Sequence, residues 1–62
     1  MVSVAKVSQF LEGIEFPANK QQIIDHARNK NAPRDVLDVL NQIPEDTYFS
    51  MAKIWEAMGR AA

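Results

Sequence analysis

Residues 33–44 read PRDVLDVLNQIP, and this stretch decides the fold class. Pro33 suits the first position of a helix, because the N–H that proline lacks would have no partner there. The apolar residues that follow recur at helical spacing and mark one buried face: Val36, Leu37, Val39, Leu40 and Ile43. Pro44 cannot continue a helix. We therefore expect a helix over residues 33–42.

The N-terminal half predicts two further helices. Ser3 is a candidate N-cap for a helix over residues 4–12, and Gly13 suits the left-handed residue that ends many helices. Asn19 is the expected N-cap of a second helix over residues 20–30. The apolar residues of these segments recur at spacings typical of helices: Val4, Val7, Phe10, Leu11 and Ile14, then Ile23, Ile24 and Ala27.

The C-terminal segment predicts a fourth helix over residues 51–58, with Ser50 as its N-cap and Gly59 as its end. Its apolar residues are Met51, Ile54, Trp55 and Met58. No stretch alternates between apolar and polar residues over a useful length, as a half-buried strand would. The chain is therefore predicted to be a single all-α domain of four short helices over residues 1–62.

The two halves of the chain share one pattern. The apolar faces of the first and third expected helices match at an offset of 29 residues, and those of the second and fourth match at 31. Two interpretations stay open. Any two capped amphipathic helices share such a template, or the chain holds two helix–loop–helix units packed about a pseudo-twofold axis. One pair of helices could not cover its own apolar face, whereas two stacked pairs can.

A chain of 62 residues has little stability to spare. A domain of this size buries only about 60% of the surface that its unfolded chain exposes, so its stability should be roughly a few kcal/mol. Burying an aromatic side chain is worth about 3–5 kcal/mol against alanine. We therefore expect Phe10 and Trp55 in the core, with Trp55→Ala unfolding the domain. Phe16 and Tyr48 should close the ends of the core.

Composition excludes several classes of function. The chain has no cysteine and one histidine, so disulfide frameworks, thiolate zinc sites and cysteine nucleophiles are excluded. Seven Lys and Arg against eight Asp and Glu give a formal net charge of −1, which does not favour polyanions. No apolar run approaches the roughly 20 residues of a membrane span, and residues 1–10 lack the layout of a signal peptide. We expect a cytoplasmic protein.

Catalysis is not expected from this sequence. Histidine is the residue type that titrates near neutrality, and the neighbour of the single His26, Asp25, points about 100° away on a helix. The carboxylates are scattered without the spacing of a metal-binding loop, and both glycines stand at expected helix ends. We therefore expect no enzyme activity, no cofactor, no metal site and no small-molecule substrate.

A set of residues in this chain resembles the pattern of a bacterial family. The residues are Phe16-Pro17-Ala18, Lys20, Ile24, His26-Ala27-Arg28, Ala32-Pro33, Val36, Leu37, Leu40, Ile43-Pro44, Tyr48, Ser50 and Ala57-Met58-Gly59. In order and spacing they are similar to domain-of-unknown-function family 2795, over residues 4–59. The resemblance implies a short helical bacterial domain and supplies no catalytic residue. The chain departs from the pattern at Phe49-Ser50-Met51 and at Trp55.

Protein interaction is the function that the sequence favours. Large, adaptable side chains gather in and just before the last expected helix: Phe49, Met51, Trp55 and Met58. Met and Trp are frequent at interfaces. The alternative is that all four are core residues, and for Trp55 the core is the favoured placement. We expect a non-catalytic interaction or structural module whose partner is another protein or a second copy of the chain.

A second function stays open through the basic segment over residues 20–34. The segment holds four cations: Lys20, Arg28, Lys30 and Arg34. They could support a weak, salt-sensitive contact with nucleic-acid phosphates. Against this, Asp35 and Asp38 lie in the helix that would face the phosphates. The simpler alternative is an ordinary solvated face.

Overall fold

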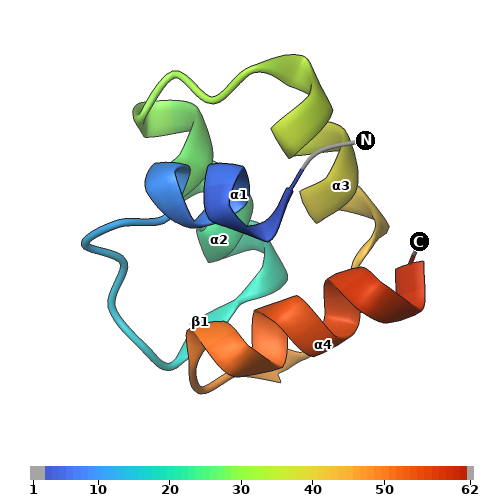
Figure 1. Cartoon of the computed structure of the whole chain (residues 1–62). Coiled ribbons are helices and arrows are strands. Elements are labelled where there is room, and N and C mark those ends of the chain that lie inside the picture. Colours follow the sequence, from blue (N-terminus) through green and yellow to red (C-terminus); the bar gives the residue numbers. More distant parts are fainter. Residues whose placement is uncertain (1–2, 62) are drawn as a thin grey trace.

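The computed structural model describes residues 3–61, and the side chains of residues 3–59. Most of the described chain lies in four helices (Figure 1): α1 (Val4–Phe10), α2 (Lys20–Asn29), α3 (Arg34–Gln42) and α4 (Met51–Ala61). Two very short strands, β1 (Ala18–Asn19) and β2 (Thr47–Tyr48), precede α2 and α4. The prediction of a four-helix, mostly helical fold is confirmed, and the strands are a feature that the sequence did not predict.

The expected N-caps are confirmed at the starts of three helices. The Ser3 hydroxyl accepts the backbone N–H three residues ahead at 3.2 Å, and the Ser50 hydroxyl does the same at 3.4 Å. At α2 the Asn19 side chain accepts the Gln22 N–H, while the Gln22 side chain accepts the Asn19 N–H, both at 2.8 Å. This reciprocal pair satisfies two N–H groups that a helix start otherwise leaves without partners.

Besides α2, which ends one residue early at Asn29, the ends of the helices differ from the predictions in three places. Helix α1 ends at Phe10, because Leu11 turns more tightly and donates its N–H to Ser8, three residues back, at 3.2 Å. Pro33 is the N-cap of α3 and not its first helical residue, since its ψ of 164° is extended. Helix α4 continues through Gly59 to Ala61, although a glycine costs about 1 kcal/mol there relative to alanine.

The two strands join the two halves of the chain. They pair antiparallel, with Ala18 opposite Tyr48 and Asn19 opposite Thr47. The chain reaches β1 through a cis Phe16–Pro17 peptide bond. Because each strand lies just before the second helix of its half, the pairing brings equivalent parts of the two halves together. An antiparallel pairing of equivalent segments is the arrangement that a twofold axis between two helix–loop–helix units requires.

The core is built from the apolar faces that the sequence predicts. Its fully buried side chains come from all four helices and their ends: Val7, Leu11, Ile23, Val36, Leu40, Ile43 and Ile54. Tyr48 is buried as expected and donates its hydroxyl to the Pro44 carbonyl at 2.6 Å. Phe10 and Phe16 are partly buried and pack against the core. The aromatic rings therefore seal the margins of a core that is aliphatic at its centre.

The predicted burial of Trp55 in the core is wrong. Its side chain is 43% exposed, whereas its neighbour Ile54 is completely buried. Successive residues of a helix point about 100° apart, so the face that buries Ile54, Ala57 and Met58 leaves Trp55 at its edge. The indole N–H donates to the Ser8 hydroxyl of α1 at 3.3 Å. Trp55 thus lies at the surface, where its side chain bridges α4 and α1.

Candidate interaction surface

A hollow of about 290 Å³ lies between the segment that follows α3 and the start of α4. Eight residues line it: Pro44, Asp46, Thr47, Tyr48, Phe49, Lys53, Glu56 and Ala57. We call this set the β2–α4 hollow. Its volume is near the lower limit of pockets that hold small molecules, roughly 300 Å³. It has room for one or two side chains of a protein segment.

The extended chain between α3 and α4 forms one wall of the hollow. Tyr48 is 4% exposed and Phe49 is 68% exposed, because successive side chains of an extended segment point to opposite sides. The hydrogen bond from Tyr48 to Pro44 holds the turn behind this wall. Asp46 accepts the N–H of Thr47 at 2.8 Å. Anchoring Tyr48 in the core therefore leaves Phe49 facing outward.

Helix α4 forms the opposite wall. Lys53, Glu56 and Ala57 are three and four residues apart, so they share one face of the helix. The Lys53 ammonium lies 3.7 Å from a Glu56 carboxylate oxygen, and both side chains are exposed. Ala57 is 3% exposed and belongs to the core. The wall is therefore apolar at its base and charged at its rim.

The four residues expected to mediate a protein contact do not share one surface. Phe49 lines the β2–α4 hollow. Met51 is partly buried against the core, and Met58 is 8% exposed within it. Trp55 follows Lys53 by two residues, which places it about 200° around α4 from the hollow. The structure thus places only Phe49 of this set at the hollow.

The four cations of the basic segment are also divided. The Lys20 ammonium, at the start of α2, donates to the Asn41 carbonyl at the end of α3, at 2.7 Å. Arg28 lies eight residues further along, about 12 Å at the rise of a helix. Lys30 and Arg34 lie nearby in sequence, around the α2–α3 turn, and Arg34 is 3.9 Å from Asp38. Lys20 therefore contacts the end of α3 and lies apart from the other three cations of the basic segment.

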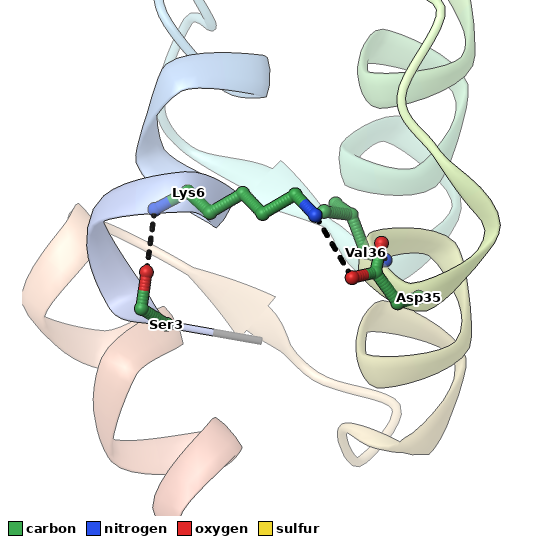
Figure 2. Close-up of polar contacts among 4 residues, drawn as sticks. All are labelled: Ser3, Lys6, Asp35 and Val36. Carbon is green, nitrogen blue, oxygen red and sulfur yellow. Dashed lines mark hydrogen bonds and ion pairs between the residues drawn. The ribbon is translucent and has the colours of Figure 1, made fainter. Parts of the chain in front are cut away.

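An ion pair that the sequence did not reveal joins α1 to α3. Figure 2 shows the Lys6 side chain reaching across to Asp35, with the ammonium 2.9 Å from the carboxylate. This hydrogen bond is the main reason that the pKa of the Asp35 carboxyl is below its usual value of 3.8. The Val36 N–H lowers the pKa further by donating to the same carboxylate at 2.8 Å. Nothing in the local spacing of Lys6 and Asp35 could have identified the pair.

His26 has a structural contact in this fold. Its Nε2–H donates to the Glu12 carbonyl at 2.9 Å and so ties α2 to the turn that follows α1. Within residues 3–61, no group of three or more His, Cys, Asp or Glu side chains is arranged to hold a metal ion. No helix of the described chain has the length and apolar character needed to cross a bilayer.

Comparison with known proteins identifies a family. No curated protein and no solved structure matches the chain. A family sequence model matches residues 2–55, which include the first three helices, both strands and the Phe49 wall of the hollow. This match confirms the resemblance inferred from the sequence. The chain belongs to the family described as "Protein of unknown function (DUF2795)".

Proposed function

We propose that this domain is a non-catalytic protein-binding module and that Phe49 anchors its partner. The observation that carries the proposal is the 68% exposure of Phe49 beside the 290 Å³ hollow. Burying a Phe side chain is worth about 1.5–3 kcal/mol, and the fold itself obtains little of that gain here. A partner that covers the ring would obtain most of it.

The surroundings of Phe49 support this proposal. Interfaces concentrate their binding energy in a few anchor side chains, and a polar rim surrounds these anchors and excludes water. Beside Phe49 the hollow has a rim of Asp46, Thr47, Lys53 and Glu56. Its lining also includes Tyr48 and Ala57, both of which are buried. The bound side chain of a partner would meet an apolar floor and a polar margin.

Nucleic-acid binding has less support from the structure. Lys20 is occupied by the Asn41 carbonyl, and Arg34 has the Asp38 carboxylate nearby. Lys20 keeps its charge in that contact, but it lies eight residues, about 12 Å, along α2 from Arg28. A few cations divided in this way give only a small, strongly salt-dependent affinity for phosphates.

A crosslinked pull-down from the native lysate tests the proposed function. Half of each sample is treated with nuclease, and three baits are compared: wild type, Phe49→Ser and Val4→Ser. Val4 is 41% exposed and does not line the hollow, so it is a matched apolar control. We expect the wild-type and Val4→Ser baits to capture a defined protein with and without nuclease treatment. The Phe49→Ser bait should capture at least tenfold less of that protein.

Two results would contradict the proposal. Equal capture by Phe49→Ser would show that the hollow is not the contact surface. Loss of the captured material after nuclease treatment would favour the basic segment instead. A circular-dichroism melt of each bait shows that the variants remain folded, which we expect because Phe49 and Val4 are both exposed.

A further inference from the structure

We infer that the β2–α4 hollow takes a peptide segment in which a basic residue, best an arginine, lies next to an apolar side chain. This inference rests on the proposed function and specifies the chemistry of the partner. Its basis is the charge around the hollow. Among residues 3–59, whose side chains the structure describes, Asp46, Glu56 and one cation, Lys53, line the hollow, and the exposed Glu45 comes directly before Asp46 in the sequence. The described lining residues carry two carboxylates and one ammonium, a charge of −1, and the neighbouring Glu45 makes the described charge −2.

The carboxylates are held where a bound cation could meet them. Asp46 is fixed by the hydrogen bond that it accepts from Thr47 at 2.8 Å. Glu56 stands on α4, on the same helix face as Lys53, with a 3.7 Å separation between their charged atoms. That long, exposed ion pair is weak, so Glu56 can exchange Lys53 for a better-placed partner cation. Complementary charge of this kind mainly sets specificity and the association rate.

Phe49 makes arginine the best match for this rim. A guanidinium group can stack on the face of an aromatic ring and also bind a carboxylate through two N–H groups. The acidic residues Asp46 and Glu56 line the same hollow as the exposed ring. An apolar neighbour of that arginine would fill the space above Tyr48 and Ala57. The volume of 290 Å³ suits this pair of side chains and not a large cofactor.

Peptide selection tests this inference with a defined probe. A phage-displayed library of random 12-residue peptides is selected on the wild-type domain and counter-selected on Phe49→Ser. The leading peptide and a copy with each Lys or Arg replaced by Glu are then synthesised with a fluorescent label. Fluorescence anisotropy gives their dissociation constants at low and high salt.

We expect the selected peptides to carry Arg or Lys beside an apolar residue. The Asp46→Asn/Glu56→Gln variant should weaken binding of the leading peptide at least tenfold and reduce its salt dependence. Asparagine at position 46 keeps the oxygen that accepts the Thr47 N–H, so the wall should stay in place. The Glu12→Gln/Glu15→Gln variant removes two exposed carboxylates outside the hollow and should leave the affinity unchanged.

Three other outcomes would overturn the inference. Acidic or neutral peptides that need Phe49 would contradict the charge argument and leave the proposed function standing. A library that yields no Phe49-dependent peptide would reject this partner chemistry, while the pull-down still decides the proposed function. Concentration-dependent self-association that Phe49→Ser abolishes, measured by sedimentation without peptide, would assign the hollow to a second copy of the chain.

Discussion

Lys6 and Asp35 form a 2.9 Å ion pair across a separation of 29 residues. That separation equals the offset that aligns the apolar face of the first helix with that of the third, so the two residues occupy equivalent positions in the two halves. A contact between equivalent positions, like the antiparallel pairing of β1 with β2, is what two helix–loop–helix units packed about a pseudo-twofold axis would give. Because the two equivalent residues differ here, they can pair an ammonium with a carboxylate.

Protonation of Asp35 should lower the free energy of unfolding of the domain at acid pH. Its pKa is lower in the folded chain than its usual value of 3.8, mainly because of the hydrogen bond from Lys6. The stabilisation is therefore complete above pH 3.8 and is lost as the pH falls through the lower, folded pKa. Urea unfolding between pH 2 and 6 should show a smaller acid loss for Asp35→Asn than for wild type. Asp38→Asn is the matched control, and equal acid losses for wild type and Asp35→Asn would contradict this role.

Ile54 should control whether the domain folds at all. Its side chain is completely buried where α4 meets the rest of the core. Removing most of such a side chain costs about 2–5 kcal/mol, which is comparable to the whole stability of a domain this small. We expect Ile54→Ala to be largely unfolded at 25 °C, while Ile54→Val loses about 0.5–1.5 kcal/mol and stays folded. Urea melts followed by circular dichroism distinguish the two, and a wild-type melt for Ile54→Ala would refute the packing.

Trp55→Ala should leave the domain folded. The side chain is 43% exposed, and its hydrogen bond to Ser8 is a single exposed contact worth about 0.5–1.5 kcal/mol. A cooperative melt at a modestly lower temperature is therefore expected. In wild type, the fluorescence of Trp55 should be readily quenched by acrylamide. A Trp55→Ala chain without a cooperative melt, or a shielded tryptophan, would place the indole in the core after all.

Tyr48→Phe should weaken the turn behind the hollow without emptying the core. The ring stays buried, but the hydroxyl that donates to the Pro44 carbonyl at 2.6 Å is lost. A hydrogen bond of this kind contributes about 0.5–1.5 kcal/mol. Urea unfolding should show a loss of this size for Tyr48→Phe and a much larger one for Tyr48→Ala. A Tyr48→Phe variant as stable as wild type would show that this bond does not hold the turn.

The sequence predicts the helical part of this fold because caps and apolar spacing are local properties. Ser3, Asn19 and Ser50 each satisfy N–H groups only a few residues away. The strand pair could not be predicted, since two-residue strands have no periodicity and β1 meets β2 only in the folded chain. Trp55 was misplaced because it stands at the margin of an apolar face, where the position of α1 decides its burial.

Only part of the hollow can be predicted from the sequence, because its two walls meet only in the folded chain. The sequence leaves open whether Phe49 lies at a contact surface or in the core, and its 68% exposure places it at the surface. The opposing wall was not expected, because the charged positions on α4 are ordinary solvated residues until the β2 segment folds beside them. Sequence patterns therefore single out Phe49, the proposed anchor, and miss the acidic residues that line the hollow beside it.

Site-specific photocrosslinking tests most directly whether Phe49 contacts a protein partner. The photoreactive amino acid p-benzoylphenylalanine is placed at position 49, where it resembles the native ring, or at the matched exposed position 4. After irradiation in living cells, the domain is purified and its adducts are identified by mass spectrometry. We expect one discrete protein adduct from position 49 and none of it from position 4. No protein adduct from position 49, or the same adducts from both positions, would contradict the proposed contact between Phe49 and a protein partner.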